Sequence, residues 1–313
     1  MPLFDAKPIS PYEGFERVDI NNPSHQQFFK RLYKSQSDVL YNHSPIYPFA
    51  YLNVGTYRAF LPKEGSLITL VAKNFTEPIL SIHAPRSFAH NIWDVVQQFD
   101  SLSKQPIILT DLTEEDADII LANELFRNWK KVKTSMDVIQ NTDKLTELNG
   151  RNFSSLRNTL RRVERDYKPD IVALCKDNYK DAIKVFENWK EKQGKKYFRV
   201  TVGRDIRLIE EYHDKIDFST TYSYVYYISG VPSGVSFGCR SYSRDDWGMD
   251  ITVKADVDIR GLADFAFVNL MQRMNEDGII HVNDSGYHSK GVKVNKFKFQ
   301  PEGEIPMFNL VRK

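Results

Sequence analysis

The spacing of apolar residues predicts alternating helices and strands in the first half of the chain. Phe28, Leu32 and Tyr33 fall on one face of a helix, whereas short runs of β-branched and aromatic residues between turn residues are typical of strands. Thr113 is followed by three acidic residues, the pattern of an N-cap whose first turn favours negative charge. The predicted helices cover 23–37 and 87–99 and begin at 113, and the predicted strands cover 46–53, 56–61, 66–72, 78–83 and 106–109.

The second half predicts a similar succession of elements. Phe153, Leu156 and Leu160 begin an apolar series at helical spacing. Three short apolar runs separated by turns predict an antiparallel meander. The predicted helices are 153–167, 179–190, 204–216 and 261–274, and the predicted strands are 171–174, 222–228, 235–241, 247–253, 279–283 and about 306–311. We therefore expect a mixed α+β chain of two related domains, residues 1–145 and 146–313, each a mostly antiparallel sheet flanked by helices.

Composition excludes several classes of protein. A chain of 313 residues with 20 Phe and 16 Tyr has ample material for folded cores, which excludes disorder as its main state. The two cysteines, Cys175 and Cys239, exclude a disulfide scaffold and a four-cysteine zinc site. Because there is neither a signal peptide nor a run of about 18 apolar residues, we expect a cytoplasmic protein without a transmembrane segment.

The net charge of +2 is the average of two unlike halves. Residues 1–150 carry 15 Lys and Arg against 18 Asp and Glu, whereas residues 151–313 carry 28 against 23. This asymmetry indicates a polyanionic partner for the second half.

Basic side chains crowd the helix predicted over 153–167. Those that share or widen one face are Arg157, Arg161, Arg162, Arg165 and Lys168. Arginines four residues apart lie above one another on a helix, and a row of guanidinium groups can hold phosphates. The alternative is a solvated helix face with no ligand.

A second candidate site is the junction between the strand 247–253 and the helix that follows it. Gly261 begins this helix, where free backbone N–H groups attract anions, and Lys254 and Arg260 add positive charge. The alternative is an ordinary helix start, because a single glycine does not make a glycine-rich phosphate loop.

Polar residues also gather where the strand 279–283 ends, a position at which sites form in layered α/β structures. His281, Asp284 and His288 match no zinc-ligand spacing, so we expect no metal. The sequence contains no nucleophile elbow, P-loop or dinucleotide-binding fingerprint, which argues against a serine hydrolase and against nucleotide hydrolysis.

Three segments carry motifs with fixed spacings. They are GRNFSSLRNTL at 150–160, Lys254-Ala255-Asp256 followed by Gly261, and Asn283 followed by Gly291-Val292, Lys296, Phe299 and Pro301. In these segments the chain resembles the C-terminal domain of bacterial phosphatidylglycerol lysyltransferases and its free-standing relatives. The corresponding family motifs are G-K-K-F-x-x-L-R-N-x-L, K-A-D…G and N…G-L-x-x-x-K-x-x-Y-x-P, and the similarity spans about residues 145–301.

The resemblance implies a tandem GNAT-like fold, with the active site in the C-terminal domain. It implies transfer of an acyl or aminoacyl group, often from aminoacyl-tRNA, to an amine or hydroxyl of a small-molecule, peptide or lipid acceptor. No tightly bound cofactor is implied. Val253 replaces a common family Glu, and Gly286 and His288 stand where the family commonly has Asp and Gly, so roles of those groups do not carry over.

On this basis each candidate residue receives a hypothetical role. The donor would be held by Arg157, Asn158, Arg161, Arg162, Arg165 and Lys168, and its phosphate or ester end by Lys254, Arg260 and Gly261. Lys296 would stabilise charge on the carbonyl oxygen and Asn283 would orient the ester. Asp250 or Asp284 would deprotonate the attacking amine.

Two alternatives use the same fold. One is an acyl-CoA-dependent N-acyltransferase, although residues 260–265 (RGLADF) give only a broken version of the [QR]-x-x-G-x-[GA] loop of such enzymes. The other is a binding module without catalysis, which the replacement at Val253 suggests. Binding of tRNA would support the aminoacyltransferase, and binding of acetyl-CoA would support the N-acyltransferase.

Overall fold

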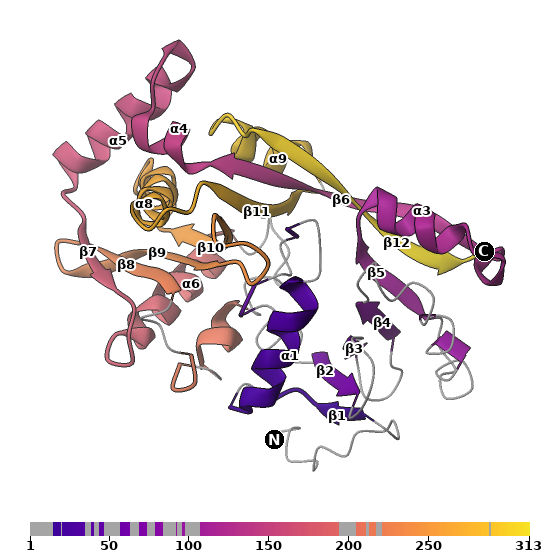
Figure 1. The fold of residues 1–313 in the computed structure, drawn as a ribbon. Coiled ribbons are helices and arrows are strands. Elements are labelled where there is room, and N and C mark those ends of the chain that lie inside the picture. The colour runs from indigo at the N-terminus through magenta and orange to yellow at the C-terminus, as the bar shows by residue number, and fades with distance from the viewer. Residues whose placement is uncertain are drawn as a thin grey trace. The chain divides into compact units, whose positions relative to one another are not determined.

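The computed structural model describes part of the chain, and every structural statement below concerns that part. It comprises residues 15–19, 21–34, 39–40, 44–46, 57–62, 69–73, 79–83, 92, 96–97, 107–193, 205–210, 213–216, 221–287 and 289–313. These residues form a mixed α+β fold with mostly antiparallel strand pairing, which confirms the expected fold class (Figure 1).

The chain divides into two compact units. The first unit contains Met1–Gln36, Tyr47–Lys133 and Met307–Lys313, and the second contains Ser37–Ile46 and Thr134–Pro306. The chain crosses between units inside β6 (Trp129–Asn141) and β12 (Gly303–Arg312). The expected domains of residues 1–145 and 146–313 stay a prediction.

The first unit has the strand order β1-β2-β3-β4-β5-β12. The strands other than β12 are β1 (Phe15–Arg17), β2 (Tyr57–Pro62), β3 (Thr69–Lys73), β4 (Ile79–His83) and β5 (Ile108–Leu112), and the helices are α1 (Pro23–Lys34), α3 (Glu114–Leu121) and η3 (Glu124–Phe126). The Oγ1 atom of Thr113 accepts from the Asp116 N–H over 3.2 Å, which confirms the predicted N-cap. Most of the strand predicted over 46–53 and of the helix predicted over 87–99 lies outside the described residues.

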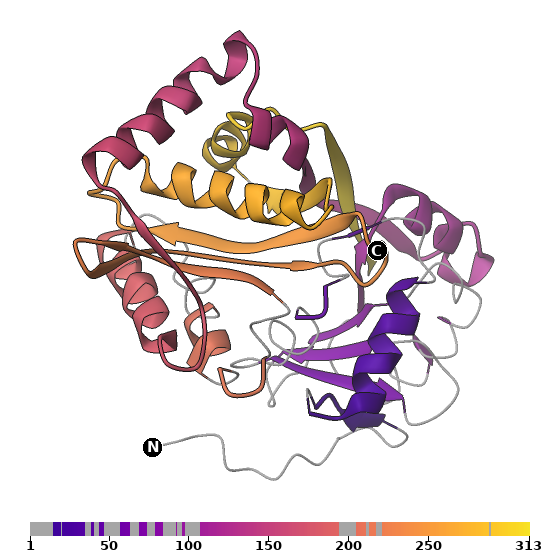
Figure 2. The same cartoon turned by 60° about the vertical axis from the view of Figure 1, so that its left-hand side comes forward.

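The second unit has the strand order β6-β11-β10-β9-β8-β7. The strands not yet defined are β7 (Asp170–Ala173), β8 (Thr221–Ile228), β9 (Val231–Arg240), β10 (Trp247–Ala255) and β11 (His281–Tyr287), and the helices are α4 (Thr142–Glu147), η4 (Arg151–Phe153), α5 (Ser154–Asp166), α6 (Tyr179–Gln193), α8 (Leu262–Glu276) and α9 (Lys290–Phe297). Within the described residues of this unit, β10 and β11 form a parallel pair. Helix α8 covers one face of the sheet and α6 the other (Figure 2).

The core of the second unit lies between α5, α8 and the sheet. Leu156, Leu160 and Val163 of α5 pack into an apolar cluster with eight buried side chains of α8. Burial of each large apolar side chain contributes about 1.5–3 kcal/mol relative to exposure. Gly261 permits this packing, because its φ is +95° and a Cβ there would lie 2.5 Å from Cγ2 of Thr159. The meander and the helices α5, α6 and α8 thus follow the predicted pattern.

Two elements at the candidate site were not predicted. Only five of the 13 residues of β6 are buried, and its first part carries lysines and is largely exposed. Helix α9 contains no fully buried residue, so its amphipathic signal is weak. The predicted strand 279–283 corresponds to β11, which extends further, to Tyr287. No helix among the described residues has the length and apolarity to cross a membrane.

Candidate functional site

Strands β10 and β11 separate just after three paired residues. Their parallel pairing joins Trp247 to His281 and ends at Met249 and Asn283. Both strands also change register with their outer neighbours at this level, β10 against β9 and β11 against β6. The next residues, Asp250 and Asp284, therefore lie where the strands part. We call this place the strand fork.

An ion pair occupies the strand fork. Nζ of Lys296, on α9, lies 2.5 Å from Oδ1 of Asp284, and it also donates to the Asp284 backbone carbonyl. The two side chains are 11% and 6% exposed. Charge-assisted hydrogen bonds of this kind are strong when water is excluded. Helix α9 thus places a fixed positive charge beside a carboxylate at the end of a strand.

Asp250 is a second carboxyl group at the strand fork. Its pKa is raised well above the usual range, first because it is buried and second because of the negative charge of Asp284. The positive charges of Lys296 and Lys254 oppose this shift. Two neighbouring carboxyl groups share a site most easily when one keeps a proton, and the environment assigns that proton to Asp250.

Gln140 completes the site and was not predicted. Its amide Nε2 donates to Oδ2 of Asp284 over 3.1 Å and to the Lys296 carbonyl over 3.4 Å. The residue is fully buried on β6. No sequence motif could have identified Gln140, because it lies more than 140 positions from its partners and on an unpredicted strand.

Asn283 contacts a different set of groups. Its Nδ2 donates to Oδ2 of Asp137 over 3.0 Å and to the carbonyl of Val39 over 3.3 Å, and its Oδ1 accepts from the Ser285 N–H. Side chains alternate along a strand, so Asn283 points to the opposite face of β11 from Asp284. The structure therefore places Asn283 beside the ion pair in sequence but gives its amide other partners.

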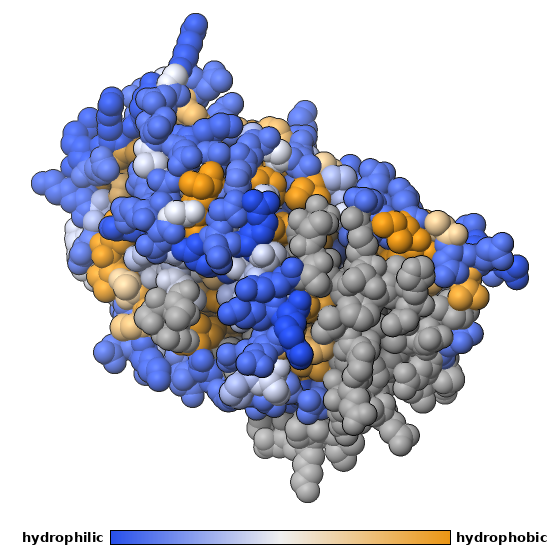
Figure 3. Space-filling model, viewed as in Figure 1, coloured by the Kyte–Doolittle hydropathy of each residue, from blue (hydrophilic) through white to orange (hydrophobic). Residues whose placement is uncertain are grey.

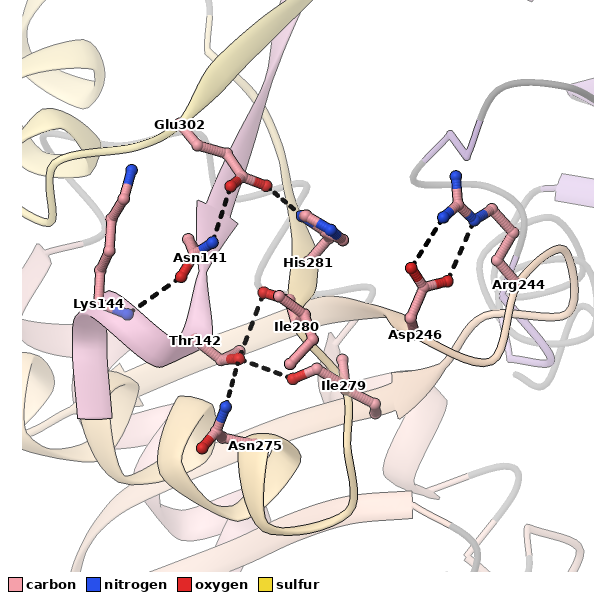
Figure 4. Close-up of polar contacts among 10 residues, drawn as sticks. All are labelled: Asn141, Thr142, Lys144, Arg244, Asp246, Asn275, Ile279, Ile280, His281 and Glu302. Carbon is pink, nitrogen blue, oxygen red and sulfur yellow. Dashed lines mark hydrogen bonds and ion pairs between the residues drawn. The ribbon is translucent and has the colours of Figure 1, made fainter. Parts of the chain in front are cut away.

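The start of β11 is fixed by a polar network. Oγ1 of Thr142 donates to the carbonyl of Ile279 over 2.6 Å, and Asn141 donates to Glu302, which also contacts His281 (Figure 4). These contacts hold β6 against β11 in the register that pairs Asn141 with His281 and Gln140 with Val282. This register brings Gln140 to the strand fork. In the same view, Arg244 pairs with Asp246 at the turn before β10.

The basic residues on and beside α5 differ in their contacts. Arg157 donates to the carbonyls of Leu148 and Gly150, so it holds the preceding loop. Arg165 is paired with Asp166 over 2.7 Å. Asn158, Arg161 and Lys168 are exposed on the hydrophilic surface that α5 presents (Figure 3).

The junction between β10 and α8 lies next to α5. Arg162 is half-buried and donates to the carbonyl of Arg260, whose side chain is exposed. Lys254 donates to Thr252 over 3.1 Å and lies 5.4 Å from the ring of Trp189 on α6. Lys254 is thus hydrogen-bonded within its own strand, and its positive charge still acts on Asp250.

Asp256 and Val253, which belong to this junction, are structural. Burial raises the pKa of Asp256. Hydrogen bonds from Lys192 and Asn188 lower it by more, so the pKa lies below its usual value. These bonds, of 2.6 and 3.0 Å, tie the loop after β10 to α6. Val253 packs against the apolar cluster of the second unit, where a Glu would be desolvated.

A cavity of about 400 Å³ lies at the start of α5. Its lining includes Lys144, Arg151, Asn149, Asn152 and Gln300 and contains no carboxylate. Among the described residues, which exclude His288, no group of three His, Cys, Asp or Glu side chains is arranged to hold a metal ion.

A known protein family matches most of the chain. The family model for the C-terminal region of phosphatidylglycerol lysyltransferase matches residues 58–305. No curated protein sequence matches the chain.

Solved structures share the fold at low sequence identity. A conserved protein of unknown function from Bacteroides thetaiotaomicron is 13% identical with a TM-score of 0.76, covering 96% of this chain and 99% of that one. L-PGS from Bacillus licheniformis is 15% identical with a TM-score of 0.65, covering 93% and 92%. A tandem GNAT protein from the clavulanic acid biosynthesis pathway is 7% identical with a TM-score of 0.53, covering 95% and 98%. These similarities confirm the expected tandem GNAT-like fold.

Proposed function

Because this chain belongs to the phosphatidylglycerol lysyltransferase C-terminal family, we propose that it transfers an aminoacyl group from aminoacyl-tRNA to an acceptor. The observation that supports this most is the buried pair of Lys296 and Asp284 beside Asp250 at the strand fork. It combines a fixed positive charge with a carboxyl group suited to proton transfer. Positive charge accelerates aminoacyl transfer by stabilising the oxyanion that forms at the ester carbonyl, and a base accelerates it by removing the proton of the nucleophile.

Lys296 would stabilise the oxyanion. An ammonium group has three N–H donors, and the Asp284 side chain and backbone carbonyl take two of them. The third remains for the carbonyl oxygen of the donor ester. A preorganised donor of this kind contributes about 10²–10³ to the rate of acyl transfer.

Asp250 would act as the base. A carboxyl group with a raised pKa is a better proton acceptor than an ordinary aspartate once it is ionised. The acceptor nucleophile attacks the ester carbonyl carbon and gives its proton to Asp250. The ester C–O bond then breaks, and the same proton passes to the departing ribose oxygen of the tRNA.

Asn283 is best assigned as a positioning residue. Its bonds to Asp137 and to the Val39 carbonyl hold β11 from the side opposite Asp284. Loss of these bonds would shift the strand that carries the carboxylate. Asn283 would therefore affect the reaction through Asp284.

The tRNA would lie along the surface of α5. Arg161 and Lys168 are exposed there, and the cavity at the start of the helix adds Lys144 and Arg151 without a carboxylate. Phosphate groups bind such surfaces with an affinity that falls as salt rises.

The alternative donor is an acyl-CoA. It is favoured by the helix start at Gly261 after β10. Binding of fluorescent tRNA and of acetyl-CoA should be measured at several salt concentrations. We expect tRNA to bind with salt-dependent affinity and acetyl-CoA not to bind. Binding of acetyl-CoA without binding of tRNA would overturn the proposed donor.

A further inference from the structure

Two buried oxygen atoms at the strand fork have no hydrogen-bond donor among the described residues. They are Oε1 of Gln140 and Oδ1 of Asp250. Both side chains lie beside Asp284: Gln140 donates to it through Nε2, and the negative charge of Asp284 acts on Asp250. Buried polar atoms are nearly always paired. A small ligand beside Asp284 that supplies hydrogen atoms would satisfy both oxygens.

The orientation of the Gln140 amide is fixed by its neighbours. Its near partners, Oδ2 of Asp284 and the carbonyl of Lys296, can only accept hydrogen bonds. The amide nitrogen must face them, because the reverse orientation would place three oxygens together. The unpaired atom of Gln140 is therefore Oε1, a hydrogen-bond acceptor, and the unpaired Oδ1 of Asp250 is also a hydrogen-bond acceptor.

The number of N–H or O–H hydrogen atoms on the nucleophile decides which class of acceptor substrate fits. A neutral primary amine has two N–H donors and a lone pair, whereas a hydroxyl has one O–H. An amine can donate to Gln140 and to Asp250 while its lone pair attacks. A hydroxyl must give its only proton to the base, which leaves Oε1 of Gln140 buried and unpaired.

We propose that Gln140 and Asp250 bind the acceptor substrate as a primary amine, and that Gln140 selects nitrogen over oxygen nucleophiles. This inference rests on the proposed function and narrows its acceptor class. The new C–N bond forms at the ester carbonyl carbon and the ester C–O bond breaks. One amine proton passes to Asp250 and then to the ribose oxygen, while the other stays on nitrogen and donates to Gln140.

Methylamine and methanol test this selection with the smallest matched nucleophiles. The full chain is incubated with radiolabelled aminoacyl-tRNA and equal concentrations of both compounds. The aminoacyl methylamide and methyl ester are separated and quantified, and each rate is divided by its rate without protein. We expect the acceleration of methylamide formation to exceed that of ester formation at least about 10-fold.

Two variants assign the selection to a residue. Gln140→Met keeps the side-chain length but removes the acceptor, so it should lower methylamide acceleration about 10-fold and bring the two accelerations together. Asp250→Asn should lower both accelerations, because each nucleophile needs the base. Lys298→Ala is the matched control and should behave as wild type, because Lys298 caps the C-terminus of the helix that carries Lys296 but is paired with Asp264.

The outcomes separate this inference from the proposed function. Equal acceleration of both products by the wild type would overturn the amine assignment and leave aminoacyl transfer standing, a result that does not depend on whether a variant folds. A folded Gln140→Met variant with the wild-type product ratio would overturn it as well. If the wild type accelerates neither product and does not bind tRNA, the proposed function falls, and the acceptor assignment falls with it.

Discussion

Nζ of Lys296 lies 2.5 Å from Oδ1 of Asp284, and this contact joins α9 to the strand fork. Both side chains are almost fully buried, so each charge depends on the other for its solvation. Removal of one member of such a pair leaves an uncompensated buried charge, which typically costs about 3–5 kcal/mol. The pair thus contributes to stability as well as to the proposed chemistry.

We predict that Lys296→Ala lowers the free energy of unfolding by about 3 kcal/mol. Lys298→Ala should cost less than about 1 kcal/mol, because Lys298 and its partner Asp264 are 33% and 23% exposed. Urea unfolding of the two variants and the wild type measures both values. Equal losses would show that the Lys296 pair is no more buried in solution than the Lys298 pair.

Asp250 should make stability depend on pH. Its pKa is raised in the folded protein by burial and by Asp284, whereas in the unfolded chain it is ordinary. Between these two pKa values the folded state binds more protons, so stability falls as pH rises through that window. Asp250→Asn should remove this fall and be more stable than wild type above the window. Thermal unfolding from pH 4 to pH 9 tests this, and parallel curves for both proteins would contradict it.

The same titration should govern activity with the opposite sign. Asp250 accepts a proton only when it is ionised, so the transfer rate should rise as pH increases through its raised pKa. A pH–rate profile measured under single-turnover conditions reports this. A rate that is constant from pH 5 to pH 9 would exclude Asp250 as the base.

Gly261 should tolerate no side chain. Its φ of +95° disfavours other residues, and a Cβ would lie 2.5 Å from Thr159 and 3.2 Å from Val163. We expect Gly261→Ala to destabilise by about 2–4 kcal/mol from strain and overpacking together. Gly278→Ala is the control for strain alone, because its φ is +77° and nothing lies within 4 Å of its Cβ position. It should cost about 1 kcal/mol.

The exposed residues Arg161, on α5, and Lys168, just after it, should affect tRNA binding without affecting the fold. We expect Arg161→Ala and Lys168→Ala each to weaken binding and to lower the slope of log affinity against log salt by about one unit. Arg157→Ala should instead lower the melting temperature, because Arg157 holds the carbonyls of Leu148 and Gly150. If both variants bind tRNA with the wild-type dependence of affinity on salt, the surface of α5 does not contact the tRNA.

Local patterns predicted the elements whose apolar faces are complete. Helices α5 and α8 bury apolar residues at regular helical spacing, and the strands of the meander are apolar runs separated by turn residues. These patterns identified both kinds of element. Lys296 was identified from a motif spacing and Asp284 from its place at the end of a predicted strand, and the structure brings them into contact. These features depend on residues that are close in sequence.

Features made by distant contacts were not predictable. Strand β6 is stabilised by pairing with β11 about 140 residues away, and its exposed lysines obscure the strand pattern. Only this pairing places Gln140 beside Asp284. Arg157 looked like a phosphate ligand because its partners, the carbonyls of Leu148 and Gly150, are backbone atoms that no sequence pattern shows.

The most direct test of the account is the deacylation of aminoacyl-tRNA by an excess of protein, compared between wild type, Lys296→Met, Lys296→Arg and Lys298→Ala. The account predicts that folded Lys296→Met is at least about 100-fold slower than wild type. Lys296→Arg should keep part of the rate because it keeps the charge, and Lys298→Ala should keep all of it. A folded Lys296→Met variant that deacylates the tRNA as fast as wild type would contradict the account.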